Sequence, residues 1–479
     1  MEAYFNGLTL TEPLKKVGKN NPLFTQRLGA DPWVLSWGGR VWVYMTGDIA
    51  EYNADGGVLD NSYAKIQTIN LISSGDMLNW TDHGAIPVAG GGNKTGAAKW
   101  AYNSWAPAVA CRKIDGKDMF FLYFADSARG IGVLTADHPA GAFTDPLGHA
   151  LINHSTPNCS DIKWLFDPAV LADGDEAYIY FGGGVPEGKA ANPGTARVAK
   201  LNPDMTSLAC DPIVIDAPYL YEDSGINKIG DVYYYSYCTN FDVDDYGREA
   251  FGIDNGEIAY MTSNDPMGLF EYKGSICKNP AHFFGTGGNN HHCIFEHNGR
   301  YYMAYHAFLL QDRMGLKGGY RASHIDELTV DADGSIQPVK YTEDGVNSIG
   351  NLNPFTPVKA AAIGTMAGIT TKKRGGDVVV CGISSGDWLM VYRADFKAVN
   401  AKRFTACVKP PESGLAVIQV RADDEVVGYL NIPSAPDSFT ELSTELEKPL
   451  NGVRDLTFVF YAEGNPPQSG LEFNWWKIE

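Results

Sequence analysis

The sequence has no long hydrophobic run. Among its 479 residues, no stretch approaches the ~20 consecutive apolar residues that a membrane-spanning helix needs. The N-terminus, MEAYFNGLTLTEPLKK, also lacks the basic start and following apolar run of a secretory leader. We therefore expect no membrane partner. The expected location is cytoplasmic if the sequence is complete, and extracellular if a leader has been removed.

Basic clusters and paired cysteines are also missing. The chain has 38 Lys and Arg against 57 Asp and Glu, a formal net charge of −19, so a nucleic-acid partner is not expected. The 8 cysteines are scattered without a C-x-x-C pair, which gives no support to a zinc site or a disulfide framework. No H-E-x-x-H, G-x-S-x-G or P-loop spacing occurs. None of these features predicts the oligomeric state.

Residues 1–345 contain a repeated strand–turn–strand unit in place of helical periodicity. Each unit has a short apolar strand, a turn with Gly or Asp, and a second strand rich in Tyr, Phe, Val and Ile. The second strands are RVWVYMT, MFFLYFA, EAYIYFGG, DVYYYSY and RYYMAYH. The units begin roughly 55 to 75 residues apart, near Asp31, Trp105, Asp167, Glu222 and His291.

Five such units predict an all-β fold in which residues 1–350 form a five-bladed β-propeller. The first strand of each blade then lines a central channel, so the starts of these strands meet at one mouth. Asp31, Asp167 and Glu222 open the first, third and fourth units, whereas Ala106 fills the acid position of the second. Each acid alone is typical of a turn or a strand end. Their joint placement predicts one site.

Three converging carboxyl groups suit the hydrolysis of a glycosidic bond with inversion. One carboxylic acid must protonate the leaving oxygen, and a carboxylate on the opposite face must activate water. The acid has to stay protonated near neutral pH, and a neighbouring carboxylate raises its pKa because two close carboxylates do not both ionise easily. A set of three therefore divides into a base, an acid and a group that tunes the acid.

Four motifs occur in order: GADPWVLSW at Asp31, FDPAVL at Asp167, YLYEDSGINK at Glu222 and GTGGNNHHCIFEHNGRYYMAYH at His291. With them, residues 20–345 resemble glycoside hydrolase family 43. The resemblance implies that Asp31 is the general base and Glu222 the general acid. It implies that Asp167 raises the pKa of Glu222 and orients it.

A histidine pair opens the fifth unit. The residues alone indicate only a polar strand end at His291 and His292. The resemblance places a hydrated calcium ion beside His291 in the channel, with few protein ligands because water holds most of the ion. A structural calcium ion in the C-terminal module is a further expectation, and no organic cofactor is implied.

Aromatic and arginine side chains near the acids are candidates for sugar binding, because flat rings stack on the C–H faces of sugars. The candidates are Trp105, Phe166, Trp164, Tyr221 and Arg321, with Tyr219 and Arg313 nearby. Arg321 has two interpretations. It donates hydrogen bonds to sugar hydroxyls, or it pairs with surface acids.

Residues 351–479 have a different sequence pattern. A linker-like NLNPFTP precedes alternating strands that show no blade repeat, which predicts a β-sandwich (jelly-roll) module. The ending LEFNWWKIE and the strand order resemble family 6 carbohydrate-binding modules. A sugar site is then expected at Trp388, Tyr392 and Asn474. The alternative is a sandwich that only packs against the propeller.

The arrangement TGGNNHH followed by a sandwich module is most similar to arabinofuranosidases (EC 3.2.1.55), which remove α-L-arabinofuranosyl side chains from arabinoxylan. The resemblance thus implies a hemicellulose polysaccharide or oligosaccharide as the partner. A β-xylosidase acting on the ends of xylo-oligosaccharides is the nearest alternative. A carbohydrate-binding propeller without catalysis is an alternative of another class, but such a module has no need of three converging acids.

Overall fold

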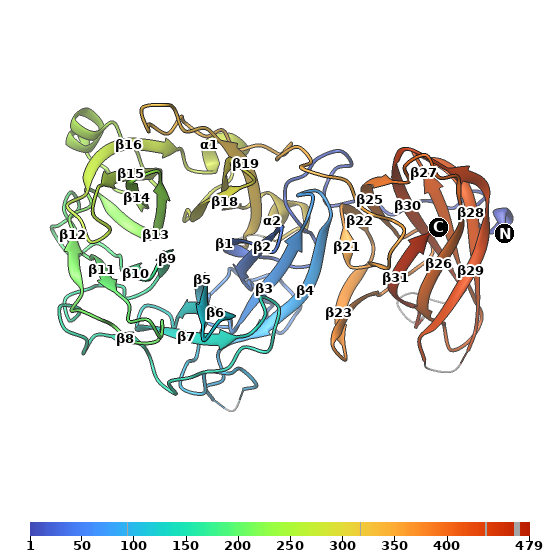
Figure 1. Ribbon diagram of the computed structural model, residues 1–479, viewed down its shortest axis with the longest axis horizontal. Coiled ribbons are helices and arrows are strands. Elements are labelled where there is room, and N and C mark those ends of the chain that lie inside the picture. The colour runs from blue at the N-terminus through green and yellow to red at the C-terminus, as the bar shows by residue number, and fades with distance from the viewer. Residues whose placement is uncertain (93, 317, 436–437, 464–469) are drawn as a thin grey trace.

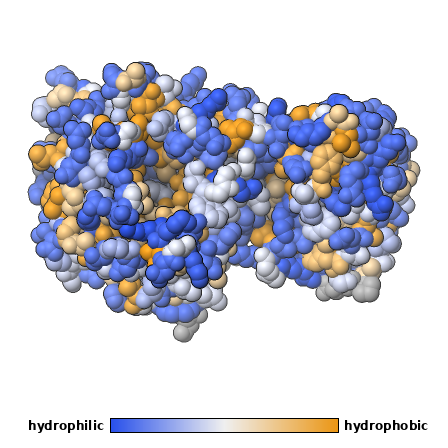
Figure 2. Space-filling model, in the orientation of Figure 1, coloured by the Kyte–Doolittle hydropathy of each residue, from blue (hydrophilic) through white to orange (hydrophobic). Residues whose placement is uncertain are grey.

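The computed structural model describes residues 1–92, 94–316, 318–435, 438–463 and 470–479. Strands make up most of the regular structure. The helical elements are short: η1 (Glu2–Tyr4), η2 (Gly247–Phe251), α1 (Ala281–Phe284) and α2 (Leu309–Arg313). Within the described ranges, no helix is both long enough and apolar enough to cross a membrane. The face shown in Figure 2 is largely hydrophilic, with scattered hydrophobic patches.

Five antiparallel sheets follow one another along the chain, and sequence-consecutive strands are hydrogen-bonded neighbours in each. The first has β1 (Ala30–Trp37), β2 (Arg40–Thr46), β3 (Thr68–Ser74) and β4 (Trp80–Pro87), and the second β5 (Trp105–Ile114), β6 (Lys117–Ala125), β7 (Gly130–Ala136) and β8 (Ile152–Asn153). The third has β9 (Ala169–Asp173), β10 (Glu176–Phe181), β11 (Ala196–Lys200) and β12 (Ile213–Ile215). The fourth has β13 (Leu220–Ile229), β14 (Val232–Thr239), β15 (Ile258–Ser263) and β16 (Glu271–Cys277), and the fifth β17 (His292–His297), β18 (Arg300–Ala307) and β19 (Ala322–Leu328).

The first strands of the five sheets contact one another in cyclic order. β1 contacts β5 and β17, β9 contacts β5 and β13, and β13 contacts β17. Figure 1 shows the five sheets grouped around a common centre. The starts of these inner strands, which carry the predicted acids, are therefore brought together from distant parts of the sequence.

The segment before β1 joins the first and fifth sheets. The amide of Gly29 donates a hydrogen bond to the carbonyl oxygen of Arg321 at 3.0 Å. The side chain of Asn21 donates to the carbonyl oxygen of Ile325 at 3.1 Å and accepts from the amide of Ile325 at 2.9 Å. Residues 21–29 thus run beside β19 and link the two ends of the series of sheets.

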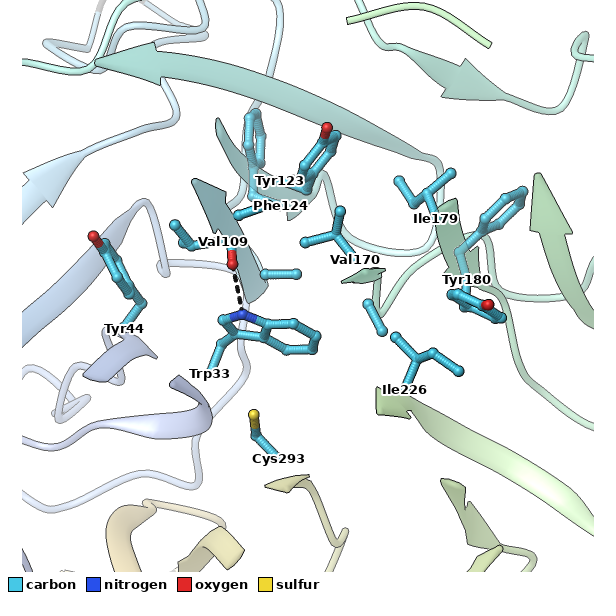
Figure 3. Close-up of a cluster of buried hydrophobic side chains, with 14 of the residues drawn as sticks. Trp33, Tyr44, Val109, Tyr123, Phe124, Val170, Ile179, Tyr180, Ile226 and Cys293 are labelled. Atoms are coloured by element: carbon cyan, nitrogen blue, oxygen red, sulfur yellow. Dashed lines mark hydrogen bonds between the residues drawn. The ribbon is translucent and has the colours of Figure 1, made fainter. Parts of the chain in front are cut away.

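Large side chains fill the spaces between the inner strands. Trp33 of β1 lies against β5, and its indole Nε1 donates a hydrogen bond to the carbonyl oxygen of Val109 at 2.9 Å (Figure 3). Val170 of β9, Ile226 of β13 and Cys293 of β17 are buried in the same core. Interiors packed to this degree deform little, so the core fixes where each inner strand begins.

Two further sheets are built from the C-terminal part of the chain. One has β23 (Thr370–Arg374), β24 (Asp377–Cys381), β31 (Glu472–Ile478), β26 (Ala401–Lys409) and β29 (Thr440–Leu450), with β20 (Val358–Lys359) paired to β31. The other has β22 (Thr365–Ala367), β25 (Trp388–Asp395), β30 (Val453–Ala462), β27 (Leu415–Ala422) and β28 (Glu425–Pro433). The two sheets share one core, in which the rings of Phe404 and Phe458 stack at 5.5 Å and Trp476 is fully buried.

The C-terminal sheets are joined to the first sheet. The short β21 (Ala362–Ile363) pairs with β4. Trp388 donates its indole N–H to the carbonyl oxygen of Thr11 at 2.9 Å, and both Trp388 and Tyr392 are buried in a cluster at this junction. Asn474 lies on β31, in the other sheet. The two aromatic rings of the expected sugar site are therefore buried at the junction, and Asn474 lies in the other sheet; sugar binding there stays a prediction.

Candidate active site

One cavity of about 420 Å³ lies among the starts of the inner strands. Its lining contains the three predicted catalytic acids, the predicted metal residue His291 and five of the residues predicted to bind sugar. These residues are Asp31, Asp167, Glu222, Trp105, Trp164, Phe166, Tyr221, Arg321 and His291. Tyr63, Ala128 and Asn289 also line it. Tyr219 and Arg313 are not part of this lining.

Irregular backbone presents two of the acids. The register between β1 and β2 shifts between Ala30 and Trp33, so Asp31 lies in a bulge with a φ of 46°. Asp167, just before β9, has a φ of 49°, and Ala106 in β5 has one of 40°. Aspartate adopts this left-handed region more readily than most residues, because its short polar side chain bonds locally. The bulges turn these side chains toward the centre.

The fourth sheet departs from this pattern. In β13 the register shifts between Glu222 and Gly225, and Asp223 inside that bulge has a φ of 69°. By register, Asp223 therefore corresponds to Asp31 and Asp167, and Glu222 stands one residue earlier. The prediction that the three acids occupy equivalent positions is wrong for Glu222, although its side chain does line the cavity.

Asp31 is surrounded by basic groups. Its Oδ1 accepts a hydrogen bond from Nη1 of Arg321 at 2.8 Å and lies 3.1 Å from Nδ1 of His306. Burial by itself raises the pKa of Asp31, but Arg321, His291 and His306 outweigh burial and hold that pKa well below its usual value. Asp31 is therefore an ionised carboxylate inside the cavity.

Glu222 and Asp167 have the opposite electrostatics. Burial raises the pKa of Glu222 well above its usual value, and the charges of Asp167, Asp31 and Asp223 raise it further. Burial and the charge of Asp31 also raise the pKa of Asp167, whose Oδ2 accepts a hydrogen bond from the amide of Asp223 at 3.0 Å. Among the described residues, Oε1 of Glu222 has no hydrogen-bond partner. The pair can therefore hold a proton next to an unused carboxyl oxygen.

His291 lies between the carboxylates. Its Nε2 is 3.1 Å from Oδ1 of Asp223, and its Nδ1 is 3.7 Å from Oδ1 of Asp31 and 3.8 Å from Oδ2 of Asp167. Burial lowers the pKa of His291 to about 3. The neighbouring His292 is completely buried and places its Nδ1 2.5 Å from Oδ2 of Asp223. His292 thus supports the wall of the site.

Protein ligands for a metal ion are few at His291. Within the described ranges, no group of three or more His, Cys, Asp or Glu side chains is arranged to hold a metal. The nearby Oδ1 atoms of Asp223, Asn289 and Asn290 are nevertheless buried without a hydrogen-bond partner in the described part of the chain. Oxygen atoms of this kind suit a calcium ion that is held mostly through water.

Arg321 pairs with two buried acids. Besides Asp31, it contacts Asp48, which accepts hydrogen bonds from Nε at 2.9 Å and Nη2 at 2.8 Å. The ring of Tyr63 lies against the guanidinium, with 4.9 Å between the ring centroid and Cζ. The interpretation that Arg321 pairs with surface acids is wrong, because both of its partners are buried acids; contact of Arg321 with sugar stays a prediction.

Aromatic rings form two walls of the cavity. On one side, the ring of Trp164 meets those of Tyr221 at 5.0 Å and Phe166 at 5.5 Å, both edge to face. On the other, Trp105 donates its indole N–H to the carbonyl oxygen of Tyr63 at 3.0 Å. Such walls offer flat apolar surfaces to a sugar ring.

Several residues of the site could not be found by reading the blade starts. Tyr63 lies in the long connection between β2 and β3, and Asp48 follows β2. His306 is at the end of β18, within the motif RYYMAYH, where it was interpreted only as part of a strand. The signal that could have found Asp48 is a lone acid directly after an apolar strand, which is also typical of an ordinary turn.

An ionised carboxylate and a pair of carboxyl groups that shares a proton face one aromatic-walled cavity, which is the arrangement that a glycoside hydrolase needs. The sequence profile described as "Glycosyl hydrolases family 43" matches residues 19–336, and the profile "Carbohydrate binding module (family 6)" matches residues 359–479. The chain belongs to glycoside hydrolase family 43, and its C-terminal part is a family 6 carbohydrate-binding module.

Known proteins resemble the chain over most of its length. It is 47% identical to an arabinoxylan arabinofuranohydrolase of Paenibacillus polymyxa, over 95% of this chain and 74% of that one. The solved structure of the arabinoxylan arabinofuranohydrolase from Bacillus subtilis, in complex with cellotetraose, is 45% identical and superposes with a TM-score of 0.92 over 97% of this chain and 99% of that one. A β-xylosidase/α-arabinofuranosidase from a compost metagenome, in complex with xylotriose and in a calcium-free form, is 27% identical with a TM-score of 0.50 over 69% and 98% of the two chains.

Proposed function

We propose that the protein is an inverting α-L-arabinofuranosidase that removes arabinofuranosyl side chains from arabinoxylan or its oligosaccharides. The observation that carries this proposal is the cavity in which Asp31 is ionised while Glu222 and Asp167 have raised pKa values. The substrate follows from the relatives at 45% and 47% identity, both of which are arabinoxylan arabinofuranohydrolases.

Each carboxyl group has a role in this reaction. Asp31 accepts a proton from water as the water oxygen bonds to the anomeric carbon, and Glu222 gives its proton to the glycosidic oxygen as that bond breaks. Asp167 keeps Glu222 protonated by its like charge. Support comes from the low pKa of Asp31, the high pKa of Glu222 and the unpartnered Oε1 of Glu222.

The proposed architecture is a five-bladed β-propeller over residues 1–350 and a β-sandwich module over residues 351–479. The cyclic contacts of the five inner strands support the propeller. The shared core of the two C-terminal sheets supports the sandwich. The propeller channel then provides the mouth at which the sugar enters.

The aromatic walls are the proposed substrate-binding surface. Trp164, Phe166 and Tyr221 on one side and Trp105 on the other would hold the arabinofuranosyl ring between apolar faces. Arg321 also lines the cavity, where its Nη1 donates a hydrogen bond to Asp31. No part of this surface requires an organic cofactor.

A hydrated calcium ion beside His291 is part of the proposal. The calcium-free form of a family 43 relative and the unpartnered buried oxygens near His291 support it. His291 and waters bridging to Asp223, Asn289 and Asn290 would hold the ion. When bound, it supplies positive charge that stabilises the surrounding carboxylates.

The proposed activity is tested with the 4-nitrophenyl glycosides of α-L-arabinofuranose and β-D-xylose. We expect faster release from the arabinoside, and a loss of kcat of about 10²–10⁴-fold in both Asp31→Asn and Glu222→Gln with the fold retained. Glu257→Gln is the matched control, because Glu257 is a buried glutamate of the fourth sheet that pairs with Lys278 and does not line the cavity. Preference for the xyloside would favour a β-xylosidase, the other activity in the name of the compost relative. If the wild type cleaves neither glycoside nor arabinoxylan, the protein is a binding propeller and the proposal fails.

A further inference from the structure

Asp48 is a buried carboxylate that stands behind the cavity. It follows β2, its side chain is completely buried, and it is not among the residues that line the cavity. Arg321 donates three hydrogen bonds to it: the backbone amide and Nε to Oδ2, at 3.0 Å and 2.9 Å, and Nη2 to Oδ1 at 2.8 Å. Asp48 thus holds both the main chain and the side chain of Arg321.

This contact fixes the plane of the guanidinium. Two parallel N–H···O bonds between an arginine and a carboxylate define the orientation of the group more sharply than a single contact does. With Nε and Nη2 engaged by Asp48, only Nη1 is directed at Asp31. The ring of Tyr63 covers the guanidinium, and the carbonyl oxygen of Arg321 accepts a hydrogen bond from the amide of Gly29, two residues before Asp31.

The result is a single-point contact at Asp31. Among the described residues, the hydrogen bond to its carboxylate group falls on Oδ1. Released from Asp48, a buried guanidinium would instead be expected to take both oxygens of Asp31, because that paired geometry is the favoured one. A carboxylate bound at both oxygens offers water only oxygens that already accept a charged hydrogen bond, which makes it a weaker base.

We propose that Asp48 is a positioning residue: by holding Arg321, it keeps Oδ2 of Asp31 available to the attacking water. The inference rests on the proposed function, in which Asp31 is the general base. Asp48 does not touch the substrate and acts through Arg321 alone. Its effect therefore falls on the chemical step and not on sugar binding.

Asp48→Asn is the direct test, measured as kcat and KM on 4-nitrophenyl α-L-arabinofuranoside. The asparagine amide keeps the shape of the aspartate side chain. It removes the charge and one of the two carboxylate oxygens that accept hydrogen bonds from Arg321. We expect kcat to fall about 10–100-fold, as for other residues that orient a reacting group, with KM within about threefold of wild type. A wild-type kcat in the folded variant would overturn the proposal.

The matched control is Asp82→Asn. Asp82 is also fully buried and holds Arg27 by two hydrogen bonds, at 2.9 Å and 2.6 Å, but Arg27, unlike Arg321, does not line the cavity. If Asp82→Asn lowers kcat as much as Asp48→Asn does, the loss is a general effect of breaking a buried Arg–Asp pair. That result would overturn the proposal.

A double-mutant cycle with Arg321→Lys tests the route of the effect. If Asp48 acts only through Arg321, the double variant has the kcat of Arg321→Lys alone. If instead the losses of kcat in the two single variants multiply in the double variant, Asp48 acts by another route.

Should Asp48→Asn not fold, Asp48→Glu is the second variant, because it keeps the charge and displaces Arg321 by one methylene. A lowered kcat at unchanged KM supports the proposal, and a wild-type kcat overturns it. Turnover by the wild type in the same assay tests the proposed function separately.

Discussion

At the scale of single residues, the cavity assigns different charges to chemically similar groups. Asp31 has Arg321 and His306 within 3.1 Å of Oδ1, and its pKa is held low. Among the described residues, Glu222 has no arginine or histidine in hydrogen-bond contact, and burial and neighbouring acids raise its pKa. An acid and a base for one reaction need such opposed pKa values.

The opposed pKa values predict a bell-shaped dependence of kcat/KM on pH. Activity needs Asp31 ionised and Glu222 protonated. Because the pKa of Asp31 is lowered, the acid limb should lie below the ~3.9 of an ordinary aspartate, and because that of Glu222 is raised, the alkaline limb should lie well above ~4.3. The measurement is kcat/KM on the arabinoside across the pH range in which the protein stays folded.

Asp167→Asn should move only the alkaline limb. Removing the like charge next to Glu222 lowers the pKa of that acid, so activity should be lost at lower pH than in the wild type. The control is Asp173→Asn, on β9 of the same sheet, which removes an acid that pairs with Lys228 outside the cavity lining. An alkaline limb that stays in place or moves upward in Asp167→Asn would contradict the role of Asp167.

The sequence could predict the acids but not their surroundings. Asp31 and Asp167 were found because each precedes a proline at the start of a repeated strand. Asp48 was missed because its partner Arg321 lies 273 residues away, and no local pattern reports such a contact. The sequence also could not predict that Arg321 pairs with buried acids, because the burial of those acids depends on how the sheets pack together.

At the scale of elements, the bulges at the starts of the inner strands decide which side chains face the centre. A bulge inserts residues that a strand-by-strand reading cannot count. For this reason the sequence pattern predicts that Glu222 is equivalent to Asp31, whereas in the register of β13 the equivalent residue is Asp223. The first two strands of each sheet could be predicted from alternating residues and turns such as Gly38–Gly39, where both glycines have positive φ.

Asn21→Ala tests how the segment before β1 is tied to β19. The substitution leaves the buried amide and carbonyl of Ile325 without their side-chain partner, which should lower the free energy of unfolding by about 1–3 kcal/mol. Urea denaturation followed by tryptophan fluorescence measures it. Asn53→Ala, in an exposed loop, is the control. Equal stability of the two variants would show that this link contributes little.

At the scale of the whole molecule, the catalytic domain and the C-terminal module form one connected body. β21 extends the first sheet, and Asn79 exchanges hydrogen bonds of 2.8 Å with the backbone of Tyr392. The residues before the first sheet also reach the module: Figure 1 shows the N-terminus beside its strands, and the ring of Tyr4 lies 4.7 Å from that of Tyr461. Trp388 and Tyr392 are both buried at this junction.

Trp388→Ala separates a junction role from a sugar-binding role. Removing this buried ring should cost about 3–5 kcal/mol of stability, seen as a lower Tm. Binding to arabinoxylan, measured by affinity electrophoresis at a temperature where the variant is folded, should stay at the wild-type level. Weaker binding to arabinoxylan by the folded variant would show that Trp388 contributes to sugar binding.

The most direct test of the account is the anomeric form of the sugar first released from arabinoxylan, followed by proton NMR as the reaction proceeds. Water activated by Asp31 attacks the face opposite the bond that Glu222 protonates, so an α-L-arabinofuranoside should yield β-L-arabinofuranose before mutarotation. Initial release of the α-anomer would mean retention through a covalent intermediate, and would contradict the assignment of Asp31 as a general base.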